Sequence, residues 1–170
     1  ALFGAGSSVG ELLKQADLAM YQAKMAGRST LRFFDPGMQK AVDEHVAFEA
    51  DLRSALAQQE FSLHYQPQLN ARGQILGVEA LLRWTQPRRG MVSPAEFIPA
   101  AEETGLILPL GRWVLHTACT RLAAWQKQPD LAPLTMAVNV SPRQFRDAGF
   151  VADVLRVLAV TGAPAAQLKL

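Results

Sequence analysis

The chain has 170 residues, of which 49% are hydrophobic and 19% charged, and its formal net charge is +2. This composition is typical of a soluble globular protein that forms one domain or parts of two. So small a net charge argues against nucleic acid or an anionic membrane surface as the main partner, and no apolar run approaches the roughly twenty residues of a membrane span. The single cysteine, Cys119, excludes an internal disulfide and suits a reducing compartment.

The N-terminal segment has a pattern typical of one amphipathic helix, because apolar residues recur at helical spacing over residues 9–26. Ser8 and Glu11 fit a capping box at the start of this helix, and Gly27 fits a left-handed stop at its end. We expect a short strand at residues 31–34. Residues 1–3 and 168–170 are typical of interrupted strands, so we expect both ends of the chain to be cuts.

Residues 36–60 are rich in charges and carry one modest apolar stripe, which predicts a helix of five or six turns. The stripe consists of Met38, Val42, Val46, Leu52, Ala55 and Leu56. Two interpretations stay open. The segment is either a connecting helix that takes part in signalling or a solvated helix without a special role.

From residue 61 onward, strands and helices alternate. We expect strands at 61–65, 75–84 and 134–140 and from about residue 168, with helices at 94–104, 109–126 and 150–161. The short turn near residues 70–73 makes the first two strands antiparallel. Alternation of strands and helices after an initial hairpin predicts an α/β architecture.

Residues 77–84 form a nearly continuous apolar run that contains one carboxylate, Glu79, and one guanidinium, Arg83. Such a run is typical of a strand that is buried on both faces. Because the two charged residues are an even number of positions apart, both point to the same face. An ion pair is one explanation, but the two side chains lie well apart along the strand. A site that holds a cation near Glu79 and an anion near Arg83 explains them better.

The Glu-Ala-Leu-Leu-Arg-Trp sequence at residues 79–84 resembles the signature of the EAL family of cyclic-di-GMP phosphodiesterase domains. Three further stretches agree with the family in order and spacing: Tyr-Gln-Pro at 65–67, Ser-Pro-Ala-Glu-Phe-Ile-Pro with Ala-Glu at 93–102, and Asn-Val-Ser with Gln at 139–144. This resemblance implies a modified TIM barrel whose first strand runs antiparallel to the rest. A complete TIM barrel needs eight strands and about 250 residues, so residues 61–170 are expected to form about half of one.

A second resemblance covers residues 16–28, where Ala-Asp-Leu-Ala-Met-Tyr-Gln-Ala-Lys is followed by Ala-Gly-Arg. This stretch is similar to the last helix of GGDEF diguanylate cyclase domains, whose catalytic motif lies upstream and is missing here. We therefore expect no cyclase activity from this chain. The two resemblances divide the chain into the final helix and strand of a GGDEF domain (1–35), a connecting helix (36–60) and the N-terminal half of an EAL domain (61–170).

The EAL resemblance implies roles for individual residues. Glu79 and Asn139 are matched to metal ligands, and both offer the hard oxygen atoms that suit Mg²⁺ or Mn²⁺. Arg83 is expected to contact a phosphate, because a guanidinium binds a phosphodiester through two hydrogen bonds and stays charged. The remaining residues matched to the substrate site are Gln66, Leu81, Phe97 and Gln144, the last of these against a guanine edge.

Ordinary structural roles stay open as alternatives for several of these residues. Asn139 also fits a helix cap or a turn, and Arg83 fits an ion pair with a carboxylate of the barrel. Core packing is the alternative for Leu81 and Phe97. Gln66 would otherwise be an ordinary polar residue at a strand end.

The reaction implied by the resemblance is the hydrolysis of cyclic-di-GMP to linear pGpG with two divalent ions. The family's other acidic residues and its lysine would follow Leu170, so the chain by itself is expected to be inactive. A receptor that binds cyclic-di-GMP without hydrolysis is the alternative. The resemblance also implies a homodimer formed through the EAL domain and a cytoplasmic location, with upstream domains sometimes tethered to the membrane.

Overall fold

The computed structural model describes residues 8–25, 27 and 29–170. The chain divides into two compact units, Ala1–Ala50 and Asp51–Leu170. No helix within the described ranges is long and apolar enough to cross a membrane.

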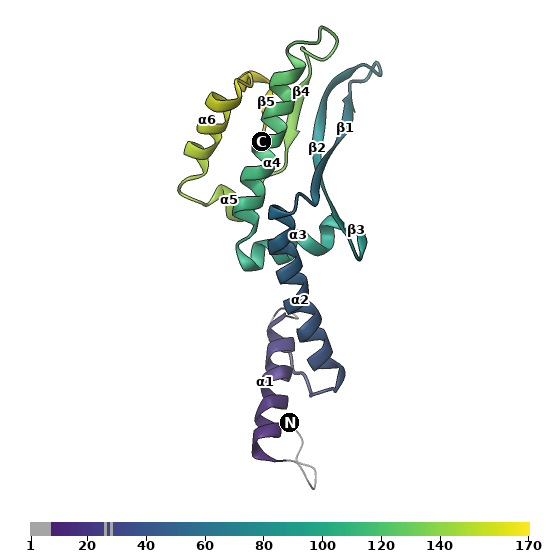
Figure 1. Ribbon diagram of the computed structural model, residues 1–170, viewed down its shortest axis with the longest axis vertical. Coiled ribbons are helices and arrows are strands. Elements are labelled where there is room, and N and C mark those ends of the chain that lie inside the picture. The colour runs from purple at the N-terminus through teal and green to yellow at the C-terminus, as the bar shows by residue number, and fades with distance from the viewer. Residues whose placement is uncertain (1–7, 26, 28) are drawn as a thin grey trace. The chain divides into compact units, whose positions relative to one another are not determined.

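The first unit contains helix α1 (Val9–Met25), whose two ends are fixed as the sequence predicts (Figure 1). At the start, the backbone N–H of Ser8 donates to the Glu11 carboxylate at 3.0 Å, and the backbone N–H of Glu11 donates to the Ser8 hydroxyl at 3.2 Å. These two hydrogen bonds form the expected capping box. At the other end, Gly27 adopts a φ of +93° and its N–H donates to the carbonyl of Lys24.

The prediction of a strand at residues 31–34 is wrong. Residues 30–35 have no regular structure, and Leu31 and Phe33 are 78% and 62% exposed. A strand requires a neighbour that pairs with its backbone N–H and C=O groups, and the described residues of this unit contain no strand. Residues 1–3, the other strand expected here, lie outside the described residues.

Helix α2 (Gly37–Ala57) confirms the prediction of a helix of five or six turns, since it has 21 residues. Its start is stabilised by the side chain of Asp35, which accepts a hydrogen bond from the N–H of Gly37 at 2.7 Å. In its last turns, which belong to the second unit, Leu52 and Ala55 are almost completely buried. Part of the predicted apolar stripe therefore packs into the core of that unit.

The second unit is built on one mixed sheet with the strand order β1-β2-β4-β5 (Figure 1). Strand β1 (Phe61–Leu69) pairs antiparallel with β2 (Ile75–Gln86), while β2, β4 (Thr135–Val138) and β5 (Leu168–Lys169) are parallel. This confirms the predicted antiparallel hairpin at the start of an α/β fold. A short strand β3 (Gly90–Val92), which the sequence analysis did not anticipate, extends β2 as a second hairpin.

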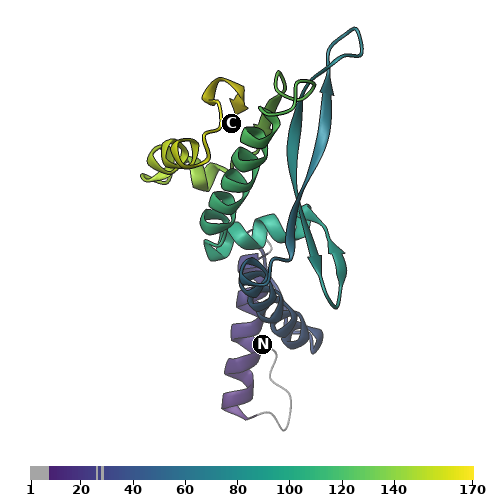
Figure 2. The ribbon, with the colours of Figure 1, turned by 45° about the horizontal axis from the view of Figure 1, so that its top comes forward.

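Helices follow the strands much as expected: α3 (Pro94–Thr104), α4 (Ile107–Trp125), the short α5 (Pro142–Phe145), α6 (Phe150–Thr161) and the 3₁₀ turn η1 (Ala165–Gln167). Helix α4 runs alongside the sheet and α6 packs on α4 (Figure 2). The core lies between the sheet and α4, where Met136, Ala118 and Leu122 are completely buried. One face of the sheet is therefore covered by helices.

The two faces of β2 differ. The side chains of Val78, Ala80 and Trp84 are buried against the helices, whereas Glu79 and the other odd-numbered residues from 79 to 83 are only partly buried. The prediction that this strand is buried on both faces therefore holds for one face only, because the described helices cover only that face. The partly buried face carries the residues expected to bind metal and phosphate.

An aromatic cluster closes the core at the C-terminal end of β2. The Trp84 ring lies 5.8 Å from Phe61 and 5.7 Å from Phe97, measured between centroids. The Trp84 indole N–H donates to the carboxylate of Glu60 at 2.8 Å. This hydrogen bond satisfies the only polar atom of a fully buried side chain, as a buried indole requires.

Candidate functional site

The strand register brings three of the predicted site residues together. Gln66 on β1 lies directly opposite Glu79 on β2, and Glu79 lies opposite Ala137 on β4. Residues that are opposite in paired strands point to the same face, and so do residues two positions apart. Asn139, two positions after Ala137, therefore lies on the same face of the sheet as Gln66 and Glu79, one step further along.

Glu79 and Asn139 are in direct contact, although 60 positions separate them in the sequence. The side-chain N–H of Asn139 donates to Oε1 of Glu79 at 2.7 Å. Asn139 is exposed and Glu79 partly buried, and no further hydrogen bond engages either side chain within the part of the chain that the structure describes. The second carboxylate oxygen of Glu79 and the amide oxygen of Asn139 are therefore available to a ligand.

These two oxygen atoms suit Mg²⁺ or Mn²⁺, which prefer carboxylate and amide oxygens. Because Mg²⁺ is octahedral, the pair supplies at most two of about six ligands. The described residues contain no group of three or more His, Cys, Asp or Glu side chains that could hold a metal. The residues present thus fit part of a metal site, which water, substrate oxygens or further side chains would complete.

Arg83 lies on the same face as Glu79 and further along β2, roughly 13 Å away at the usual rise of a strand. Its guanidinium donates to the carbonyl oxygen of Leu82 at 2.9 Å. No carboxylate forms an ion pair with Arg83 within residues 8–25, 27 and 29–170. The ion-pair alternative therefore finds no support, and most of the guanidinium donors are available to an anion.

A pocket of about 390 Å³ is lined by Arg83 and Asn139 but not by Glu79, and its volume lies within the range of small-molecule sites. Arg83, Asn139 and Glu102 are among its polar residues, and Leu81 lies on its wall. The other apolar lining residues are Ala80, Leu82, Pro94, Ile98, Ile107, Leu110, Val114, Val140 and Pro142. The pocket thus combines the Arg83 guanidinium with a largely apolar lining.

Two of the predicted substrate contacts are placed differently. Phe97 is completely buried in the aromatic cluster with Phe61 and Trp84, so its side chain has no surface to offer a ligand, and the packing alternative is what the structure supports. Gln144 lines the pocket but is only 8% exposed. The side-chain amide oxygen of Gln144 accepts a hydrogen bond from the backbone N–H of Ser141 at 3.2 Å. Gln144 is therefore part of a capping box at the start of α5.

Two contacts that were not predicted from the sequence anchor α5. The Ser-x-x-Gln spacing at residues 141–144 is a readable capping-box signal. A second anchor, the guanidinium of Arg143, donates to the backbone carbonyl of Glu102 at the end of α3. Nothing in the local sequence indicates this contact, because the two residues are 41 positions apart.

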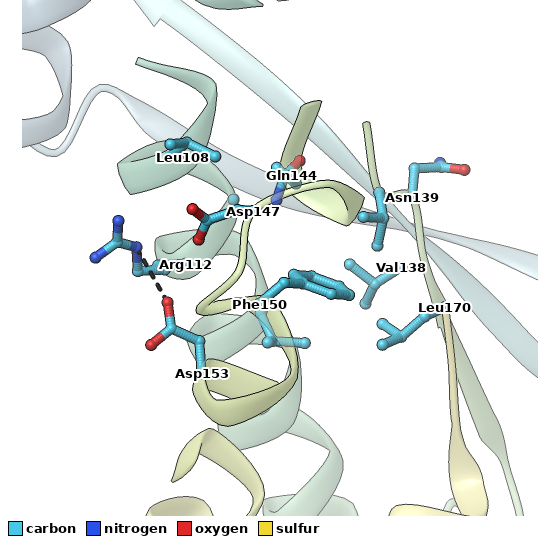
Figure 3. A pocket seen from close by; sticks show the side chains of 12 residues that line it. Leu108, Arg112, Val138, Asn139, Gln144, Asp147, Phe150, Asp153 and Leu170 are labelled. Atoms are coloured by element: carbon cyan, nitrogen blue, oxygen red, sulfur yellow. Dashed lines mark ion pairs between the residues drawn. The ribbon is translucent and has the colours of Figure 1, made fainter. Parts of the chain in front are cut away.

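A second cavity lies beside the site, between α4 and α6, and has room for about one water molecule at 20 Å³ (Figure 3). An ion pair between Arg112 and Asp153, 3.3 Å apart, closes one side of it. In Figure 3 the Asn139 side chain points away from the middle of this cavity. The cavity therefore separates packed helices and is too small for a substrate.

An antiparallel first strand beside parallel strands, with Asn139 hydrogen-bonded to Glu79 across the sheet, agrees with an α/β domain of the EAL type. Residues 49–170 match the EAL domain family, and the chain belongs to this family. The match begins within α2 and includes the whole second unit.

Two curated relatives have names that state an activity. The bifunctional diguanylate cyclase/cyclic di-GMP phosphodiesterase MucR of Pseudomonas aeruginosa is 43% identical over 156 residues, which are 91% of this chain and 23% of that protein. The cyclic di-GMP phosphodiesterase PdeR of Escherichia coli is 40% identical over 153 residues, which are 90% of this chain and 23% of that protein. The chain thus spans less than a quarter of the length of either relative.

Among solved structures, the MucR phosphodiesterase in complex with c-di-GMP aligns with a TM-score of 0.69 and 41% identity, covering 72% of this chain and 49% of that one. The EAL enzyme Bd1971, in its form with cAMP and cyclic-di-GMP bound, aligns with a TM-score of 0.72 and 29% identity. That alignment covers 96% of this chain and 43% of the enzyme. Both likenesses agree with a partial barrel-like sheet.

Proposed function

We propose that this chain supplies part of the active site of a phosphodiesterase that hydrolyses cyclic-di-GMP to linear pGpG. The observation that carries the proposal is the 2.7 Å contact between Asn139, just past the end of β4, and Glu79, in the middle of the neighbouring strand β2. It supports the proposal because it places two hard oxygen ligands together in a domain of the EAL family. The names of MucR and PdeR agree with this activity.

Each site residue has a separate task in this proposal. Glu79 and Asn139 hold a divalent metal, Mg²⁺ or Mn²⁺, with further ligands. The bound metal would supply hydroxide from a coordinated water and offset charge on the phosphodiester oxygens. Arg83 orients a phosphate through its planar guanidinium.

The rest of the pocket binds and shields the dinucleotide. Leu81 supplies apolar surface beside it, and Gln66, exposed and opposite Glu79, contributes a polar contact on the same face of the sheet. The apolar wall excludes bulk water, which strengthens the electrostatic interaction between Arg83 and the phosphate.

Several finer points belong to the same proposal. Two ions operate in the complete domain, and residues 1–170 alone are inactive because Glu79 and Asn139 cannot complete a metal site. We also propose that the first unit is the tail of a GGDEF domain, that the EAL domain forms a homodimer, and that the protein acts in the cytoplasm. Chromatography of the product formed by residues 1–170 alone tests their inactivity, and measurement of mass in solution tests the homodimer.

The function is tested by incubating the complete EAL domain with cyclic-di-GMP and Mg²⁺ or Mn²⁺ and measuring pGpG. We expect turnover that EDTA abolishes and that Glu79→Ala lowers by at least about 10²-fold, since a first metal ligand is lost. Glu96→Ala, which removes an exposed carboxylate from α3, is the matched control and should leave turnover unchanged. A folded domain that binds the dinucleotide without turnover would instead support the receptor alternative.

A further inference from the structure

Asn139 lies one residue past the end of β4, so the backbone pairing of the sheet brings it near Glu79 but does not hold it directly. The last paired residue is Val138, and residues 139–141 have no regular structure. Helix α5, which follows, is a single turn of four residues. A turn this short is unstable by itself, because nucleation of a helix is unfavourable. Other contacts must therefore hold the segment that carries Asn139.

The first contact is the capping box. The N–H of Ser141 donates to the Gln144 side chain, and the N–H of Gln144 donates to the Ser141 hydroxyl, both at 3.2 Å. This reciprocal pair closes a ring that begins two residues after Asn139. The Gln144 side chain thereby constrains the backbone next to the proposed metal ligand.

The second contact is between Gln144 and helix α4. The Gln144 side chain lies directly over Gly111, where an added Cβ atom would come within 2.5 Å of the Gln144 Cδ atom. A glycine inside a helix is unfavourable relative to alanine, so its presence at this position has a structural reason. Only glycine leaves room for the buried Gln144 amide.

We infer that Gln144, which packs against Gly111, is a positioning residue that holds Asn139 in place for metal binding. This inference rests on the proposed function. Arg143 adds a third anchor through its hydrogen bond to the Glu102 carbonyl, so α5 is tied to both α3 and α4. Metal ligands must be held to within about 0.5 Å by the residues that surround them. Without the contact between Gln144 and Gly111, α5 and the preceding residues would shift by more than this tolerance.

This role differs from a contact between Gln144 and a guanine edge, and the two make opposite predictions. A positioning residue acts on metal affinity and leaves the affinity for the dinucleotide in EDTA unchanged. A residue that contacts guanine acts on dinucleotide affinity and leaves metal affinity unchanged. The burial of Gln144 and its use in the cap favour the positioning role.

The test uses the complete EAL domain and two variants, Gln144→Ala and Gly111→Ala. Free Mn²⁺ is measured by electron paramagnetic resonance, and cyclic-di-GMP binding in EDTA is measured by calorimetry. We expect each variant to weaken Mn²⁺ binding by about 10–100-fold, the usual effect of losing a residue that orients a metal ligand. Dinucleotide affinity in EDTA should not change.

A double variant, Gly111→Ala with Gln144→Ala, distinguishes loss of the contact between these residues from a general folding defect. Once Gln144 is removed, a Cβ at Gly111 meets no amide, so Gly111→Ala combined with Gln144→Ala should bind Mn²⁺ as well as Gln144→Ala alone. Two controls match the substitutions. Gly10→Ala, made in a protein that carries residues 1–170 and the complete EAL domain, adds a Cβ to a helical glycine with open space around it, and Gln58→Ala removes an exposed glutamine. Both should leave Mn²⁺ affinity unchanged.

Two results would overturn the inference. One is unchanged Mn²⁺ affinity in Gln144→Ala together with weaker dinucleotide binding in EDTA. The other is an additive loss in the double variant. Glu79→Ala separates this failure from that of the proposed function. If Glu79→Ala also leaves Mn²⁺ affinity unchanged, the proposed metal site itself is wrong. If Mn²⁺ affinity falls in Glu79→Ala but not in Gln144→Ala, only the positioning role is rejected.

Discussion

Substitution of Gly77 by alanine tests the packing that brings the two proposed metal ligands together. Gly77 on β2 lies opposite Thr135 on β4, two positions before the pair of Glu79 and Ala137. A Cβ at Gly77 would lie 2.5 Å from the Thr135 carbonyl oxygen, about 1 Å short of ordinary van der Waals contact. Strand β4 must therefore move away from β2 if alanine is accommodated.

Such overpacking usually costs about 1–3 kcal/mol. In a domain of roughly 250 residues, this corresponds to a decrease in Tm of about 3–10 °C. The displacement also separates Asn139 from Glu79, so Mn²⁺ affinity should fall. Thermal unfolding of the complete domain, followed by circular dichroism, measures the first effect, and Mn²⁺ titration measures the second.

Two variants serve as controls for Gly77→Ala. Gly10→Ala, compared in a protein that carries residues 1–170 and the complete domain, has nothing near its added Cβ and should leave the Tm unchanged or slightly higher. Combining Gly77→Ala with Thr135→Ala removes the threonine hydroxyl but not its carbonyl, so recovery should be partial. An unchanged Tm together with unchanged Mn²⁺ affinity in Gly77→Ala would refute the claim that close contact between β2 and β4 sets the geometry of the site.

Three further predictions concern single side chains. Arg83→Lys keeps the charge but loses the planar pair of donors, so calorimetry should show cyclic-di-GMP affinity lower by about tenfold with an unchanged Tm; unchanged affinity would contradict the phosphate contact. Trp84→Phe removes the hydrogen bond to Glu60 from a fully buried position, so the free energy of unfolding in urea should fall by about 1–3 kcal/mol, and a neutral result would contradict the importance of that bond. Burial raises the pKa of the Cys119 thiol to about 11, so a thiol reagent at pH 8 should label Cys119 only after unfolding, and rapid labelling of the folded domain would contradict this. Because an ordinary thiol ionises near pH 9, the contribution of Cys119 to stability is present below that pH and is lost between pH 9 and about 11, and Cys119→Ala should lack this part of the pH dependence.

Elements with strong local signals could be predicted from the sequence. Helix α3 begins and ends where expected because Ser93 caps it, Pro94 occupies its first turn and Gly105 adopts the left-handed conformation that stops it. Strand β3 could not be predicted in this way. Its three residues have no periodicity, and only pairing with β2 defines them as a strand. The segment at residues 31–34 shows the converse, since a strand-like pattern without a partner remained irregular.

Motifs in the sequence could predict which residues belong to the candidate site, but not how these residues contact one another. Glu79 and Asn139 were matched separately, but their contact depends on the register of β2 and β4, which a local pattern does not reveal. Phe97 was placed near the substrate, yet its face of α3 packs into the aromatic core. The relation between Gln144 and Gly111 depends on how α5 rests on α4, so only the three-dimensional structure reveals it.

The most direct test of the account is a crystal structure of the complete EAL domain soaked in Mn²⁺, with the metal located by its anomalous scattering. We predict a peak within about 2.0–2.3 Å of both a carboxylate oxygen of Glu79 and the amide oxygen of Asn139, the distance expected for a hard divalent cation. A Mn²⁺ ion bound elsewhere in the domain, with Glu79 and Asn139 still hydrogen-bonded only to each other, would contradict the proposed metal site.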